Sequence, residues 1–146
     1  MKFCKLSYPV KLTRTSPNTI MAEFRDVAGA MTEAATEQEA LYWAQDALLV
    51  LLSGYMDKHR PIPAPSERRR GERLVEVPTT QAMKLAIYQA MIEQEVTQAS
   101  LAAGMDIDGR QVRRILDLDH STRLDHLLRA LEVLGKEVSV TISDAA

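Results

Sequence analysis

Hydrophobic and polar residues alternate along two stretches near the N-terminus, which is the pattern of half-buried β-strands. The first stretch covers residues 6–13 and the second covers residues 20–24. Between them, Ser16-Pro17-Asn18 is typical of a hairpin turn. Pro9 lies within the first stretch and lacks a backbone N–H, so it favours a sheet edge or a break near the start of that strand.

A short third strand is predicted around residues 30–34, and the spacing of apolar residues then becomes helical. Thr36 and Glu39 have the spacing of a capping box, which predicts that a helix of about twenty residues begins there. Tyr42 and Trp43 flank its apolar stripe and are expected to pack in the core. The stripe consists of Leu41, Ala44, Leu48, Leu51, Leu52 and Tyr55.

The chain is predicted to divide after this helix. Residues 61–73 contain three prolines within five residues and then a basic run broken by glycine, a composition typical of a linker. Residues 74–78 predict a fourth strand, with Leu74 and either Val75 or Val77 buried. We therefore expect a first domain made of residues 1–60 with strand 74–78, and a second domain made of residues 79–146.

The second domain has the spacing of helices. Pro78 opens a first helix, Ser121 or Thr122 opens a last one, and Gly135 is expected to end it. The apolar stripe of the last helix is Leu124, Leu127, Leu128, Leu131 and Leu134.

Residues 97–116 predict a helix-turn-helix, in which two short helices pack across a tight turn. Asp108 is expected to cap the second helix, and Gln111 completes a capping-box spacing. Arginine and glutamine suit bidentate hydrogen bonds to guanine and adenine, whereas Gln98 is expected to contact phosphate. The alternative is an ordinary helical hairpin with a solvated basic face. The candidate DNA-binding residues are Gln98, Asp108, Arg110, Gln111, Arg113 and Arg114.

A terminal strand is predicted at residues 137–142, where Val138, Val140 and Ile142 alternate with polar residues. No other strand is expected in the second domain, and a lone strand must pair with something. Its simplest partner is the same strand of a second copy, so these three residues are the candidate dimerisation residues. The expected assembly is a homodimer, or a tetramer if the first domain adds a second interface.

Acidic residues dominate residues 21–57, where Arg25 is the one basic residue. The whole chain has a formal net charge of −2 and one cysteine, Cys4, which excludes an internal disulfide. No apolar run approaches the ~20 residues that a membrane span requires, and no secretory signal is recognisable at the start. We expect a cytoplasmic protein without a membrane partner.

Enzymatic and metal chemistry are not expected. Two-metal hydrolysis needs several converging carboxylates, whereas Glu23 and Asp26 are expected on opposite faces of an extended segment. His120 and His126 are six residues apart and do not share one helix face. No glycine-rich phosphate loop is present. The chain is therefore expected to have no catalytic residues, no metal site and no cofactor.

The N-terminal half resembles the HicB antitoxin family. The similarity rests on residues 8–15, on Phe24, Asp26, Gly29 and Thr32 within FRDVAGAMTEAAT, on the helix beginning EQEALYWAQDAL, and on the PIPAPS segment after it. The C-terminal half resembles the Cro/Xre-type DNA-binding domain of one branch of that family. Such domains usually have glycine in the turn where this chain has Asp106, which tolerates left-handed geometry better than most residues.

The resemblance implies an α+β fold. Its N-terminal domain would be a degenerate ribonuclease-H-like β-β-β-α-β unit, followed by an all-α helix-turn-helix domain with the terminal dimerising strand. It also implies an antitoxin that binds a basic, RNA-cleaving HicA-type toxin and represses its own operon by binding double-stranded operator DNA. The candidate toxin-binding residues are Glu23, Asp26, Glu33, Glu37 and Glu39. The alternative function is a dimeric transcriptional regulator whose N-terminal domain senses a small molecule, which requires an apolar cavity with converging polar groups.

Overall fold

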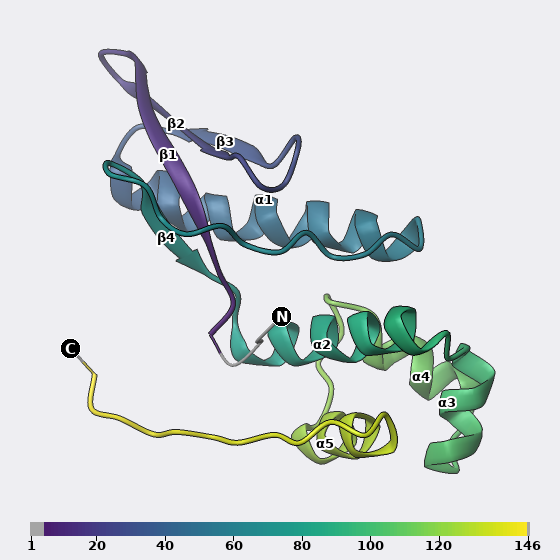
Figure 1. The fold of residues 1–146 in the computed structure, drawn as a ribbon. Coiled ribbons are helices and arrows are strands. Elements are labelled where there is room, and N and C mark those ends of the chain that lie inside the picture. The colour runs from purple at the N-terminus through teal and green to yellow at the C-terminus, as the bar shows by residue number, and fades with distance from the viewer. Residues whose placement is uncertain (1–4, 146) are drawn as a thin grey trace. The chain divides into compact units, whose positions relative to one another are not determined.

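The computed structural model describes residues 5–145, which form two compact units at residues 5–78 and 79–145. The described residues contain one four-stranded antiparallel sheet and five helices, so the fold class is α+β (Figure 1). Among these helices, none is both long and apolar enough to cross a membrane.

The sheet of the first unit has the strand order β3-β2-β1-β4. β1 (Ser7–Ser16) and β2 (Thr19–Phe24) form the predicted hairpin, in which Ser16 pairs with Thr19. β1 pairs with β2 only from Val10 onward and pairs with β4 from Ser7 to Val10. Pro9 therefore has a strand partner on one side only, which explains how a central strand accommodates proline.

β3 (Met31–Ala34) and β4 (Arg73–Glu76) form the two edges of the sheet. The strand at 74–78 was predicted with Leu74 buried, and this detail is wrong. Val75 and Val77 are buried, whereas Leu74 is 54% exposed because adjacent residues of a strand point to opposite faces.

α1 (Glu37–Asp57) covers one face of the sheet, and Thr36 caps it as predicted by accepting a hydrogen bond from the Glu39 backbone N–H. The buried row of α1 consists of Ala40, Ala44, Leu48, Leu52 and Met56. The predicted stripe was therefore slightly rotated, because it favoured large side chains over the small Ala40. Tyr42 and Trp43 are consequently exposed, and the expectation that they pack in the core is wrong.

The segment at residues 58–72 runs back along α1 toward β4 (Figure 1). It packs onto the first unit through buried Ile62 and through a 2.6 Å hydrogen bond from Tyr8 Oη to the carbonyl of Pro63. The proline-rich segment is thus held against the first unit at these points, and the chain passes to the second unit after Pro78.

The second unit contains α2 (Thr79–Gln94), α3 (Gln98–Met105), α4 (Gly109–Ile115) and α5 (Leu124–Val133). These helices share one core. It consists of Ile87, Ala90, Met91, Leu101, Ala102, Met105, Val112, Ile115, Leu127, Ala130, Leu131 and Leu134.

Two details of α5 differ from the prediction. Its N-cap is Arg123, which makes no side-chain capping bond, while Thr122 Oγ1 donates to the carbonyl of Arg114, 3.4 Å away. Its end agrees with the prediction, because Gly135 adopts a φ of 73° and the next N–H bonds back to the carbonyl of Leu131.

The predicted terminal strand is absent from the single chain. Residues 136–145 have no assigned secondary structure and extend from the end of α5 (Figure 1). The described part of the second unit offers no sheet for this segment to join. A strand therefore requires another chain, and a single chain does not test that prediction.

Candidate DNA-contacting helix and partner surfaces

The turn between α3 and α4 depends on a left-handed residue. Asp106 adopts φ 54° and ψ 49° at the end of α3, the conformation for which glycine is usual. Gly104 lies within α3, where its lack of a side chain matters for packing rather than for the turn. A Cβ atom there would lie 2.9 Å from Val133 Cγ1, so glycine allows α3 to approach α5 closely.

α4 presents its polar residues to solvent and anchors itself through Val112 and Ile115, which are buried. Asp108 caps α4 by accepting a 2.6 Å hydrogen bond from the Arg110 N–H. All six candidate DNA-binding residues are exposed, and within residues 5–145 none of the three arginines on α4 forms an ion pair. Those arginines are Arg110, Arg113 and Arg114, beside Gln111 on the same helix.

The C-terminal end of α4 is held by a lysine that the sequence analysis did not single out. Lys84 of α2 is fully buried, and its Nζ donates to the carbonyls of Arg114, Asp117 and His120 at 2.9, 2.7 and 2.7 Å. The last carbonyls of a helix lack partners within the helix and carry partial negative charge. Lys84 supplies those partners, although burial lowers its pKa, an effect that nearby Asp117 opposes.

The candidate toxin-binding acids do not form one cluster. Glu23 and Glu33 are exposed on the sheet face opposite α1, because their neighbours Ala22 and Phe24 are buried against the helix. Glu37 and Glu39 lie in the first turn of α1 instead, and both are exposed. Two separate acidic surfaces are therefore available in the first unit.

Asp26 differs from the other four acids because its carboxylate is occupied. Its two oxygens accept from Ser66 Oγ at 2.6 Å and the Ser66 N–H at 2.8 Å, and the side chain is 11% exposed. The neighbouring Arg25 forms two hydrogen bonds with the carboxylate of Glu72, at 2.9 and 3.1 Å. This network, together with the Arg69 N–H, lowers the pKa of Glu72 and raises that of Arg25. These residues fasten the 58–72 segment to the end of β2.

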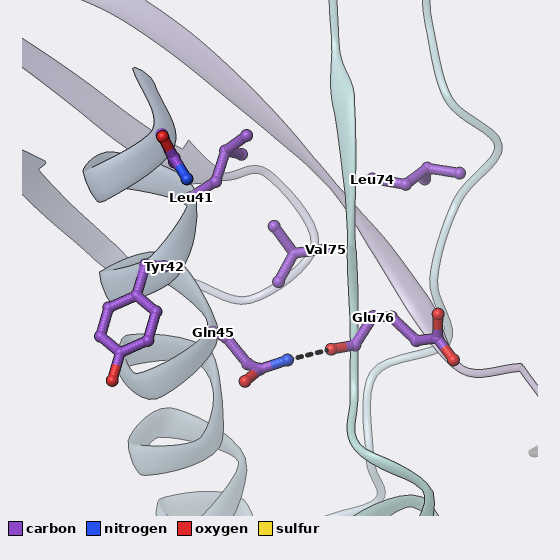
Figure 2. A pocket seen from close by; sticks show the side chains of 7 residues that line it. Leu41, Tyr42, Gln45, Leu74, Val75 and Glu76 are labelled. Carbon is purple, nitrogen blue, oxygen red and sulfur yellow. Dashed lines mark hydrogen bonds between the residues drawn. The ribbon is translucent and has the colours of Figure 1, made fainter. Parts of the chain in front are cut away.

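A groove of about 320 Å³ lies between α1 and β4. Figure 2 shows Val75 pointing toward α1 and Leu74 pointing away from it. Gln45 crosses the groove and donates a 2.8 Å hydrogen bond to the carbonyl of Glu76. The groove is open rather than enclosed, and the Gln45 amide that crosses it is already bonded, which does not favour a small-molecule sensor site. Among residues 5–145, no three potential metal ligands come together.

The candidate dimerisation residues are exposed in the single chain, with Val140 and Ile142 at 77% and 93%. Leu124 and Leu128 of α5 are also exposed, although the apolar pattern placed them in the core stripe. The second unit thus leaves apolar side chains uncovered both on α5 and along its C-terminal segment.

Comparison with known proteins adds independent information. Residues 7–86 match a family model described as the HicB-like antitoxin of bacterial toxin–antitoxin systems. The chain is 33% identical over 137 residues to Antitoxin HicB of Escherichia coli K12, which covers 94% of this chain and 99% of the relative. It is 35% identical over 135 residues to Antitoxin HicB 2 of Photorhabdus laumondii, covering 92% and 95%. A third relative, Antitoxin HicB of Pseudomonas fluorescens, is 26% identical over 130 residues, covering 88% and 89%.

Proposed function

The chain belongs to the HicB-like antitoxin family, and on that premise we propose that it neutralises a basic HicA-type toxin and represses its own operon. The first unit binds the toxin, and the second unit binds operator DNA as a helix-turn-helix domain.

The toxin-binding role is supported by the charge of the first unit. A protein that grips RNA must carry a positive surface, and an acidic protein surface can cover it by complementary charge. Glu23, Glu33, Glu37 and Glu39 are exposed and suited to such a contact. Asp26 is the weakest of the original candidates, because Ser66 and Arg25 occupy its carboxylate.

The DNA-binding role is supported by α4, whose exposed arginines have no acidic partner among the described residues. α4 enters the major groove and reads base edges, while Gln98 at the start of α3 contacts phosphate. The turn at Asp106 and the hydrogen bonds of Lys84 position α4, and Gly104 lets the preceding α3 pack closely on α5.

Dimerisation completes the proposal, because palindromic operators require two copies of the reading helix. The 137–142 segment pairs with its equivalent in the second copy, which gives its backbone groups partners and covers its valines.

Deleting residues 136–146 is expected to weaken self-association and operator binding together. Sedimentation that shows an unchanged dimer would exclude the segment as the main contact.

The DNA-binding proposal is tested by mobility-shift titration against the promoter upstream of the gene at fixed salt. Arg110→Ala and Arg113→Ala are each expected to lose about 1–3 kcal/mol of binding free energy if the side chain makes a bidentate base contact. Arg129→Ala, an exposed arginine on α5, is the matched control. Parent-like binding by both α4 variants contradicts the proposal.

The toxin-binding proposal is tested with residues 1–78 alone, since the first unit has its own sheet and core. Circular dichroism first establishes that the fragment is folded. The fragment is then expected to bind the toxin and to restore growth of cells that express it. A folded fragment that does neither shows that the first unit is not the neutralising part.

A further inference from the structure

The outer side of α1 carries an exposed aromatic pair. Tyr42 is 70% exposed and Trp43 is 51% exposed, and their rings lie 5.1 Å apart in an edge-to-face arrangement. Val50, two turns further along on the same side, is 62% exposed. These residues lie opposite the buried row that contains Ala44 and Leu48. We refer to Tyr42, Trp43, Asp46 and Val50 as the aromatic face.

The charged side chains that α1 itself places on this side are all negative. Asp46 lies within the aromatic face, and Glu39 and Asp57 extend the same side of the helix at both ends; all three are exposed. α1 contains no lysine or arginine. A two-fold contact between two copies would place these carboxylates against one another, which is unfavourable. The charge therefore argues for a basic protein partner and against a second copy of this chain.

The sheet face with Glu23 and Glu33 offers a weaker contact. Its large exposed apolar residues are Met31, at 48%, and Leu74 of β4, at 54%, and Lys11 is paired in register with Glu23 on the adjacent strand. Tryptophan and tyrosine are over-represented among the residues that dominate binding energy, and their rings also attract cations. α1 combines such anchors with an acidic rim, whereas the sheet face combines acids with a lysine.

We propose that the aromatic face of α1 is the surface on which the basic toxin docks. The proposal rests on the proposed neutralising function and assigns the principal contact to α1 rather than to the sheet. Trp43 and Tyr42 become buried against the toxin, a basic side chain of the toxin packs on the rings, and Asp46 and Glu39 guide association through complementary charge.

Trp43 is the one tryptophan of the chain, so it reports on this surface without interference from other positions. The full-length chain is labelled with 5-fluorotryptophan and titrated with a catalytically inactive variant of the basic toxin encoded beside its gene. Its single ¹⁹F resonance is expected to shift and to become insensitive to solvent exchange between H₂O and D₂O. A saturated complex in which the resonance keeps its solvent sensitivity overturns the proposal.

Matched variants of the full-length chain separate the two surfaces. Trp43→Ser is expected to weaken toxin binding about 30-fold, the range of an interface hot spot, whereas Met31→Ser on the sheet face changes it less than about twofold. Asp46→Lys is expected to slow association about tenfold at low salt, whereas Glu33→Lys makes the same charge change with little effect. Circular dichroism verifies that each variant keeps the parent fold.

The remaining outcomes also discriminate. If Glu33→Lys and Met31→Ser weaken binding while the α1 variants do not, the toxin docks on the sheet and the proposal is wrong. If Trp43→Ser instead dissociates the free protein into smaller species in sedimentation, the face is a contact between copies and the proposal is equally wrong. If the parent chain does not bind the toxin at all, the neutralising function itself fails.

Discussion

The two units each bury one charged side chain among the described residues, and they satisfy it in opposite ways. In the first unit, Glu72 is 7% exposed and bonds to the guanidinium of Arg25 and to the Arg69 N–H. In the second unit, Lys84 is fully buried, and its Nζ donates to three neutral backbone carbonyls. One charge is neutralised by an ion pair, and the other is solvated by the ends of a helix and a loop.

The bonding partners of the two buried charges show which segment of the chain each of them stabilises. Glu72 and Arg25 join the 58–72 segment to the end of β2, so they stabilise the first unit, which carries the acidic surfaces. Lys84 holds the end of α4 and the residues that follow it, so it positions the proposed reading helix. Lys84 forms no ion pair among residues 5–145, and the charge of nearby Asp117 only partly offsets the cost of its burial. Lys84 therefore depends largely on its three hydrogen bonds, because each would leave an unpaired buried group if broken.

The largest expected effect is therefore that of Lys84→Met. Methionine has a similar length but no donor, and the carbonyls of Arg114, Asp117 and His120 would lose their common partner. We expect a loss of about 2–4 kcal/mol in the free energy of unfolding of the second unit. Urea unfolding and hydrogen exchange of the α2 and α4 amides measure this loss.

Lys136→Met, which removes an exposed lysine from the same unit, is the control for Lys84→Met. Trp43 fluorescence, which reports on the first unit, is expected to give an unchanged unfolding curve for both variants. If Lys84→Met keeps the stability of the parent, the three hydrogen bonds are not what secures the end of α4.

The sequence was sufficient to predict much of the fold. The alternation in residues 6–24 predicted the hairpin, the capping residues Thr36 and Asp108 mark where α1 and α4 begin, and Gly135 follows the end of α5. These features are local, since a cap or a period of two depends on neighbouring residues alone. The terminal strand is different, because its partner would have to come from another chain.

The side chains that form the surfaces were harder to predict. Tyr42 and Trp43 were assigned to the core because large aromatic residues usually lie there. Ala40 and Ala44 continue the spacing of four that Leu48 and Leu52 also follow, and this row is the buried side of α1. That spacing was the available signal that Tyr42 and Trp43 lie on the opposite, exposed side. Lys84 carried no such signal, because its three acceptors lie 30 to 36 residues away in sequence.

The second-largest effect is expected for Glu72→Gln in the first unit. Glutamine keeps the shape of the side chain but loses the charge that pairs with Arg25. The two carboxylate oxygens of Glu72 accept from Arg25 and from the Arg69 N–H, whereas a glutamine amide has one acceptor oxygen. We expect a lower urea midpoint in Trp43 fluorescence, smaller than the change that Lys84→Met causes in the second unit. Glu67→Gln, an exposed glutamate in the same segment, is the control. Equal midpoints for both variants would contradict a stabilising role of the pair.

The pH dependence of stability is expected to differ between the units. The pKa of Glu72 is lowered in the folded state, so its contribution is complete above the ordinary value of 4.5 and is lost as pH falls below it. The pKa of Lys84 is also lowered, so the unfolded chain binds more protons between the folded pKa and the ordinary value of 10.5. The Lys84 contribution to stability therefore rises with pH across that interval. Comparing the parent with Glu72→Gln and with Lys84→Met across pH isolates the two slopes, and identical slopes in parent and variant would contradict the assignment.

The smallest expected effect concerns the contact between α3 and α5. Gly104→Ala would place a Cβ 2.9 Å from Val133 Cγ1, which costs about 1–3 kcal/mol by overpacking and is partly offset by the ~1 kcal/mol preference of alanine over glycine within a helix. We expect a net loss of about 1 kcal/mol in the second unit. Adding Val133→Ala removes the opposing methyl groups, so the double variant is expected to recover the stability of Val133→Ala alone or to exceed it. A double-mutant cycle in urea measures this coupling, and strictly additive effects would mean that α3 is kept close to α5 by other residues.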